Sequence, residues 1–266
     1  QFNEELLKLE IATASDKWLT QAPDENDQAA IIAFPYAGGG PSVFHGWDKS
    51  LQPYRLRLCP VSLPGKEKRR AEKLPDDIHE LAQSIAASVL AHIHKPYVML
   101  GLCYGASLAY LTAQLTTAAG RPPVGIIVAG GRAPHTPPPV PVSDMTDDDF
   151  ISTLHRLGFI SDIVLSNREL LDLYLPMLKS DFIMDEKFIL PYPKCKFLFP
   201  ISVCYGEKDA ITPEHDILEW SIYTSNLFMA QKFKEDQLFF AKEYDRFIEY
   251  IVEKSLSLVE NPNFIE

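Results

Sequence analysis

Cys103 stands in the segment Gly101-Leu102-Cys103-Tyr104-Gly105, which follows an apolar run and opens a helical pattern. Strand, tight turn and helix in this order form a nucleophile elbow, in which flanking glycines permit the strained turn that holds the nucleophile above a sheet. A helix N-terminus beneath the thiol favours its thiolate form. The segment therefore predicts that Cys103 is a covalent nucleophile. The simpler alternative is a buried cysteine between two packing glycines.

An elbow nucleophile requires two backbone donors that stabilise the oxyanion of its intermediates. One donor is the N–H of the residue after the nucleophile, here Tyr104. The other is expected in the loop after the first strand, which reads FPYAGGG over residues 34–40. Three glycines let backbone amides approach a ligand closely, so this loop is the candidate for the second donor.

The acid and the base of a catalytic triad are expected after the late strands. Asp209 follows the apolar run 199–206 directly and is the predicted acid, although a turn aspartate capping a helix near 213–220 would look the same. After the last apolar run the chain reads KEDQLFF (234–240), which offers Gln237 where a histidine is expected. No histidine follows it.

Seven histidines occur in the chain, at positions 45, 79, 92, 94, 135, 155 and 215. His135 follows a strand at the carboxyl edge of the expected sheet, where the active sites of open α/β sheets gather. We therefore take His135 as the candidate substitute base, with His215, six residues past Asp209, as a second possibility.

Cysteine and serine differ in what they can do without a base. A serine hydroxyl needs one, whereas a cysteine is a few per cent thiolate unaided. Cys103 can thus accept an acyl group from a thioester without a histidine. Hydrolysis of the acyl-cysteine is harder, because general-base help is worth roughly 10²–10⁴-fold and a glutamine cannot act as a base at neutral pH. The pair of Cys103 and Gln237 favours an acyl-enzyme that waits for a better nucleophile, such as a thiol or an amine.

Short apolar runs that alternate with helical patterns must position these residues. Continuous apolar runs suit strands buried on both faces of a parallel sheet, and the alternation implies an α/β fold. The expected helices between the early strands cover 77–93 and 104–118. The expected strands cover residues 29–35, 56–61, 97–102, 124–130, 199–206 and 228–233.

One region interrupts this rhythm. A proline-rich hinge with acidic helix-start signals covers residues 134–149, and two amphipathic helices are expected at about 147–157 and 167–179. We interpret residues 136–190 as a helical lid inserted in one domain that covers residues 29–266. Residues 1–28 are polar and are expected to form an N-terminal extension, packed or mobile.

Composition bounds the function classes. The chain has 266 residues, 46% of them hydrophobic, and a formal net charge of −11, which argues against a nucleic-acid binder. No apolar run approaches 18 residues, so no membrane span is expected. Four cysteines without paired spacing indicate neither a metal site nor a disulfide framework, and favour the cytoplasm. The run KEKRRAEK (66–73) is the candidate basic patch for an acidic partner.

Several segments together resemble the type II thioesterases, discrete α/β-hydrolase enzymes that serve nonribosomal peptide and polyketide synthases. The similarity runs from about residue 29 to 250. It rests on the segments FPYAGGG, LPGKEKR (63–69), GLCYGASLA (101–109), GGRAP (130–134), LPMLKSDF (175–182) and YGEKDAITP (205–213), on Trp220 and on the pair Phe239–Phe240.

The resemblance implies an α/β-hydrolase fold in which Ala37 and Tyr104 supply the oxyanion-hole amides. It implies Asp209 as the triad acid and residue 103 as the nucleophile. The substrate would be an acyl group on the phosphopantetheine arm of a carrier protein, with no metal or separate cofactor. The sequence departs from the family twice, with Cys103 in place of serine and Gln237 in place of histidine.

Four functions stay open at this point. The first is an enzyme that acts on acyl or aminoacyl thioesters of carrier proteins through acyl-Cys103, by transfer or by slow editing hydrolysis. The second is a dienelactone-hydrolase-like cysteine hydrolase, and the third is a carrier-protein binder that has lost turnover. The fourth possibility is that Cys103 or Gln237 was engineered into the chain to trap an intermediate. Aromatic and aliphatic residues predict an apolar chamber under the lid or a simple core: Phe150, Phe159, Leu171, Tyr174, Phe182 and Phe188.

Overall fold

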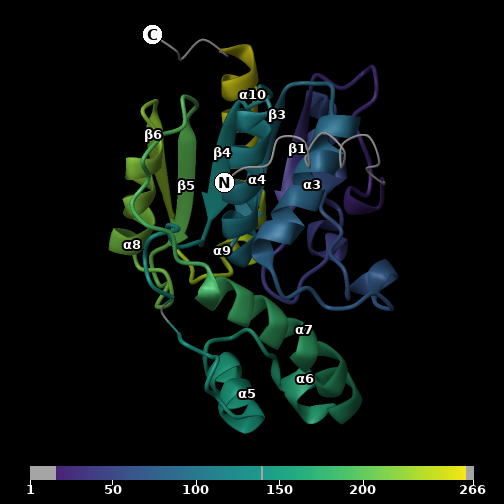
Figure 1. Ribbon diagram of the computed structural model, residues 1–266, viewed down its shortest axis with the longest axis vertical. Coiled ribbons are helices and arrows are strands. Elements are labelled where there is room, and N and C mark those ends of the chain that lie inside the picture. Colours follow the sequence, from purple (N-terminus) through teal and green to yellow (C-terminus); the bar gives the residue numbers. More distant parts are fainter. Residues whose placement is uncertain (1–15, 139, 262–266) are drawn as a thin grey trace.

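Six parallel strands form one sheet in the computed structural model, which describes residues 16–138 and 140–261. Their order is β2-β1-β3-β4-β5-β6, so the chain starts inside the sheet and winds outward in both directions. The parallel α/β architecture expected from the apolar runs is confirmed (Figure 1). The strands are β1 (Ala29–Phe34), β2 (Leu56–Pro60), β3 (Tyr97–Leu102), β4 (Gly125–Ala129), β5 (Ile201–Gly206) and β6 (Phe228–Phe233).

Helices cover both faces of this sheet. On one face α3 (Ile78–His92) and α4 (Tyr104–Ala118) pack against alternate strand residues such as Ile32. On the other face α2 (Trp47–Leu51), α9 (Phe239–Lys242) and α10 (Tyr244–Glu260) pack against the residues between them, such as Ile31. Because successive strand side chains point to opposite faces, a strand covered on both sides must be apolar throughout, which explains the uninterrupted runs.

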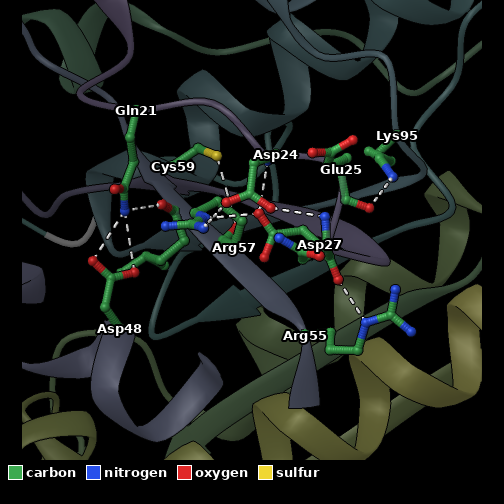
Figure 2. Close-up of polar contacts among 11 residues, drawn as sticks. Gln21, Asp24, Glu25, Asp27, Asp48, Arg55, Arg57, Cys59 and Lys95 are labelled. Atoms are coloured by element: carbon green, nitrogen blue, oxygen red, sulfur yellow. Dashed lines mark hydrogen bonds and ion pairs between the residues drawn. The ribbon is translucent and has the colours of Figure 1, made fainter. Parts of the chain in front are cut away.

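Edge strand β2 is tied to the segment before β1 by a polar network (Figure 2). Arg57 on β2 donates from Nε to Asp27 Oδ2 and from Nη2 to Asp24 Oδ2, both at 2.8 Å. Gln21 donates to the Leu58 carbonyl at 2.6 Å. Residues 1–15 of the expected N-terminal extension lie outside the described residues, whereas Leu19 is buried and pairs with Val61 in an isolated antiparallel bridge.

The long connection between β4 and β5 carries three helices, which lie beyond one end of the sheet (Figure 1). Side chains of Thr146, Ser161 and Asn167 cap α5 (Asp147–Arg156), α6 (Asp162–Ser166) and α7 (Arg168–Lys187), respectively, by accepting a backbone N–H near each start. Helix α7 continues eight residues past the expected end at 179 and contains Pro176. These extra turns matter because they carry side chains to the nucleophile elbow.

Further helices lie between the last strands and at the end of the described chain. A short helix α8 (Glu214–Leu218) and a 3₁₀ helix (Glu219–Tyr223) connect β5 to β6. The long C-terminal helix α10 was not predicted, although its buried residues Phe247, Ile248, Ile251 and Val252 recur at helical spacing. Within the described residues, no helix is both long and apolar enough to cross a membrane.

Candidate active site

Cys103 occupies the sharp turn between β3 and α4 that the sequence predicts. Its backbone lies at φ 49° and ψ −117°, a conformation that non-glycine residues rarely adopt, and its N–H donates to the Ala129 carbonyl at 2.8 Å. The turn packs too tightly for side chains on either flank. A Cβ on Gly101 would lie 2.5 Å from Ala106 Cα, and one on Gly105 would lie 2.4 Å from the Phe34 carbonyl oxygen. The geometry is that of a nucleophile elbow.

A small cavity of about 40 Å³ opens beside Cys103. The insertion supplies part of its wall with the apolar residues Leu157, Phe159 and Phe182. Two charged residues, Arg132 and Asp185, also line it. The cavity is therefore an apolar pocket with a small polar region next to the nucleophile, as is usual for small-molecule sites.

The surroundings of Cys103 keep it a thiol. Burial, followed by the nearby Asp185 carboxylate, raises the pKa of Cys103 to about 12, whereas the Tyr104 backbone N–H acts in the opposite direction. The expectation that the helix N-terminus makes a thiolate prevail is therefore wrong for the resting protein. Desolvation penalises the anion by more than the helix amides stabilise it.

The glycine-rich loop lies against the elbow, as a second oxyanion donor requires. Strand register places Phe34 opposite Gly101, and Ala37 is buried in the loop that follows. The N–H of Gly38 is already engaged, since it donates to Asp181 Oδ2 at 2.6 Å. Ala37 and Tyr104 stay the predicted oxyanion donors.

Asp181, on α7, is also the partner of Lys66 in an ion pair that is almost entirely shielded from solvent. The Lys66 and Asp181 side chains are 1% and 0% exposed. The second carboxylate oxygen, Asp181 Oδ1, has no hydrogen-bond partner among the described residues. One carboxylate of the insertion thus fixes both the loop amide of Gly38 and a buried cation.

Asp185, one helical turn after Asp181, connects α7 to the elbow. Its Oδ1 accepts a hydrogen bond from Ser107 Oγ at 2.9 Å, and its Oδ2 accepts one from Arg132 Nε at 3.3 Å. Ser107 lies one turn after Cys103 on α4, so the Asp185 carboxylate sits above the first turn of that helix. Burial raises the pKa of Asp185, while Arg132 and Ser107 oppose that shift.

Asp209 lies in the loop after β5, where the triad acid is expected. Its Oδ1 accepts the backbone N–H groups of Ile211 at 2.8 Å and Thr212 at 3.0 Å. Its Oδ2 is buried and has no partner among the described residues. Burial raises the pKa of Asp209, and the two amides lower it. The acid is thus oriented by the backbone but bonded to no base.

Gln237 follows β6 at the position expected for the base, but its side chain points elsewhere. Nε2 of Gln237 donates to the backbone carbonyl of Leu157, in the insertion. The backbone of Gln237 nevertheless lies near Asp209, because both are close to Gly130. A Cβ built on Gly130 would lie 3.8 Å from the Gln237 carbonyl oxygen and 3.9 Å from Asp209 Oδ2. This contact ties Gln237 to the insertion, and position 237 stays the predicted place of the base.

His135 does not reach the cavity. Its Nδ1 lies 3.0 Å from the Tyr223 hydroxyl, its Nε2 lies 3.2 Å from Glu219 Oε2, and its ring packs on Tyr192. His215 is exposed and pairs with Asp216. None of the seven histidines lines the Cys103 cavity, so the structure does not bring the predicted substitute base to the nucleophile.

Two of the five cations in the basic run 66–73, Lys66 and Arg69, are buried. Lys66 is buried against Asp181, and Arg69 is buried against Glu72 and the Ser62 carbonyl. Lys73 pairs with Asp76. Lys68, Arg70 and Lys73 are the exposed cations of the run.

The expected apolar chamber divides into separate sets. Phe159 and Phe182 line the cavity, whereas Phe150 and Leu171 belong to a small core inside the insertion. Phe188 joins the main core. Tyr174 lies on an outer groove.

All four cysteines are free thiols. Within the described part of the chain no cluster of three or more His, Cys, Asp or Glu side chains could hold a metal ion.

Comparison with known proteins agrees with this geometry. The family model described as "Thioesterase domain" matches residues 29–253. The chain belongs to the thioesterase family. Among curated proteins it is 32% identical to "Thioesterase PikA5" of Streptomyces venezuelae over 77% of this chain and 73% of that protein. It is 28% identical to "Gramicidin S biosynthesis protein GrsT" of Aneurinibacillus migulanus over 93% of this chain and 96% of that one.

Solved structures give the same assignment. The thioesterase RedJ from the prodiginine pathway of Streptomyces coelicolor superposes with a TM-score of 0.81 at 26% identity, covering 88% of this chain and 93% of RedJ. The type II thioesterase BorB from the borrelidin cluster gives 0.80 at 26% identity, covering 90% and 98%. The resemblance to type II thioesterases and the α/β-hydrolase fold are confirmed, and the dienelactone-hydrolase alternative loses its basis.

Arg132, Asp181 and Asp185 are residues near the site for which the sequence suggested no role, and Lys66 was expected only as part of a basic patch. Three of them lie inside segments that carried the resemblance: Arg132 in GGRAP, Lys66 in LPGKEKR and Asp181 in LPMLKSDF. Their place in these segments was the available signal, but it does not show that the charged residues are buried and paired.

Proposed function

We propose that this thioesterase-family protein takes acyl or aminoacyl groups from the phosphopantetheine thiol of a carrier protein onto Cys103 and passes them to a second acceptor thiol. The observation that carries the proposal is that Asp209 Oδ2 has no hydrogen-bond partner among the described residues, while Gln237, at the expected base position, donates to the Leu157 carbonyl. The relatives support the setting, since their names place them in peptide and polyketide pathways.

In the first step the Cys103 sulfur attacks the thioester carbonyl carbon, and the oxyanion accepts hydrogen bonds from the Tyr104 and Ala37 amides. Collapse of this intermediate breaks the bond between carbon and pantetheine sulfur. The leaving thiolate receives the proton that Cys103 gave up, so one thioester and one thiol yield one thioester and one thiol. Because donor and product are both thioesters, the exchange is nearly balanced in free energy and reversible.

In the second step an acceptor thiol attacks acyl-Cys103 and Cys103 leaves. Water is a poor competitor because it must lose a proton as it attacks, and the absent general base is worth roughly 10²–10⁴-fold. Gln237 can orient a group but cannot take a proton at neutral pH. Transfer is therefore favoured over hydrolysis by the residue types as well as by their contacts.

An outer groove of about 1020 Å³ supports delivery by a carrier. It runs along α7 to the glycine-rich loop, with Ala37 and Gly38 at its inner part and Tyr174 on its wall. Lys68 and Arg70, two exposed cations of the basic run, also line it. A phosphopantetheine arm carries one phosphate, for which such cations are suitable partners.

The test follows loading and release separately. The protein is incubated with an acyl carrier protein, and the acyl adduct on Cys103 is measured by intact mass. A second, unloaded carrier is then added, and both acyl-carrier and free acid are quantified. We expect a stable adduct that empties onto the acceptor. Fast release as free acid that the acceptor does not accelerate would contradict transfer. Carrier binding without any adduct would indicate a binder that has lost turnover.

A further inference from the structure

Two carboxylates flank the Cys103 thiol. Asp185 lines the cavity directly. Asp209 lies next to Gly130, which also lines the cavity. A Cβ built on Gly130 would be 3.9 Å from Asp209 Oδ2. Asp209 is 6% exposed, and Oδ2 is its buried, unpartnered oxygen. Backbone amides hold Oδ1, but a desolvated carboxylate oxygen without a donor costs free energy, so a cationic donor in the site would be stabilising.

Arg132, the cation already in the cavity wall, has its donors committed. Its Nε donates to Asp185 Oδ2, its Nη1 to the Thr136 carbonyl at 2.6 Å, and its Nη2 to the Phe188 carbonyl at 2.7 Å and to the Asp185 carbonyl. Four of the five guanidinium N–H groups are thus used. Arg132 therefore serves to hold α7 and does not offer a fork to an anionic substrate.

Asp185, in contrast, keeps acceptor capacity. Each of its oxygens accepts one hydrogen bond, from Ser107 and from Arg132, whereas a carboxylate has about four acceptor sites. The Asp185 side chain is 22% exposed, and it lines the cavity beside Cys103. A further donor from a bound acyl group can be accommodated there.

The charges in this region sum to a net negative site. Arg132 offsets Asp185, and Asp209 has no offset, because the next buried cation, Lys66, is paired with Asp181. A carboxylated acyl group would be repelled, a neutral one would leave Asp209 uncompensated, and a cationic one would be attracted.

We propose that the Cys103 cavity selects aminoacyl groups, with Asp185 as the residue that binds the protonated α-amine of the substrate. In an aminoacyl thioester the amine is on the carbon next to the carbonyl that Cys103 attacks, so a carboxylate above the first turn of α4 is suitably placed. α-Amino groups titrate at about pH 7.7–8.0 and are largely protonated at neutral pH. The apolar walls and small volume fit a short or apolar amino-acid side chain.

The bound ammonium would also activate the nucleophile. Asp185 and Asp209 both raise the pKa of Cys103 in the empty cavity. A cation placed between these carboxylates and the sulfur offsets that effect and stabilises the thiolate. The thiol would thus stay protonated until the correct substrate arrives, which protects it from unproductive reactions.

The inference rests on the proposed acylation of Cys103 and is tested with a matched pair of substrates. Alanyl-pantetheine and propionyl-pantetheine differ only by the amine. Loading of Cys103 is followed by intact mass, and each rate is divided by the rate of the same thioester with free 2-mercaptoethanol, because an ammonium group makes any thioester more reactive. We expect a corrected preference for alanyl of roughly tenfold to hundredfold, the range of one hydrogen bond to a charged group.

The Asp185→Asn variant keeps acceptor and shape but removes the charge, so its corrected preference should fall toward one. Asp245→Asn, an exposed residue at the start of α10, should leave it unchanged. Wild-type protein that loads propionyl as well as alanyl overturns the inference and leaves acyl transfer standing. Loading of neither thioester overturns both. Equal slowing of both substrates in Asp185→Asn, with the preference retained, would assign Asp185 a structural role only and also overturn the inference.

Discussion

Gln237 donates its side-chain amide to the backbone carbonyl of Leu157, and this contact ties the loop after β6 to the insertion between β4 and β5. Asp209 lies where a triad acid is expected, oriented by the amides of Ile211 and Thr212, with its free oxygen directed at no histidine. The described residues thus combine a nucleophile elbow with an oriented carboxylate, and no histidine lines the Cys103 cavity.

Restoring a base should restore hydrolysis. We expect Gln237→His to accelerate release of free acid from acyl-Cys103 by at least roughly tenfold, toward the 10²–10⁴-fold that general-base help supplies. The rate of Cys103 loading should change much less, because the thiol attacks without a histidine. Single-turnover release after loading, measured as free acid, distinguishes the two steps.

Gln231→His is the matched control for this substitution. Gln231 lies on β6, and its side chain bonds to the Lys232 carbonyl, away from the cavity. It should release free acid at the wild-type rate. A folded Gln237→His variant that also hydrolyses no faster than wild type would show that the base position is not what limits hydrolysis.

The buried thiol should be slow to alkylate, with a steep pH dependence. Since the pKa of Cys103 is raised to about 12, thiolate is a minor form at neutral pH and increases tenfold for each pH unit. We expect the rate of carbamidomethylation at Cys103, measured by peptide mapping, to rise about tenfold per unit from pH 7 to 9 without a plateau. In urea-unfolded protein the rate should level off near the ordinary thiol pKa of about 8.5. A plateau below pH 9 in the folded protein would contradict the raised pKa.

Strands and elbow could be predicted because their signals are local. A strand covered on both faces must be apolar at every position, and a turn such as Gly101-Leu102-Cys103 requires glycine where Cβ atoms would collide. The end of α7 was missed because the contacts of its last turns are not local: Asp181 pairs with Lys66, and Asp185 bonds to Ser107 and Arg132.

The contacts that decide the chemistry are not local. Gln237 and Leu157 are 80 positions apart, and Lys66 and Asp181 are 115 apart. Lys66 lies in a basic run that resembles solvated surface, and only the folded chain shows that it is buried. No rule of sequence spacing predicts such a pair, because the pair depends on how the insertion packs against the rest of the domain.

The buried ion pair between Lys66 and Asp181 should be costly to break. Asp181→Asn leaves the Lys66 ammonium without a counter-charge in a site that excludes water, and removing one partner of a buried pair typically costs about 3–5 kcal/mol. Urea unfolding should show this loss as a lower free energy of unfolding. Asp76→Asn, in the exposed pair with Lys73, is the control and should have a far smaller effect.

Replacing both partners should separate stability from activity. Lys66→Met with Asp181→Leu removes both charges and fills the space with apolar side chains, so stability should recover most of what Asp181→Asn loses. The Gly38 N–H nevertheless loses its acceptor, Asp181 Oδ2, and with it the constraint on the loop that carries the predicted oxyanion donor Ala37. We therefore expect the double variant to be folded but to load Cys103 at least roughly tenfold more slowly than wild type, since a misplaced oxyanion donor costs up to 10²–10³-fold. Wild-type loading in the stable double variant would show that the contact between Asp181 and Gly38 serves stability alone.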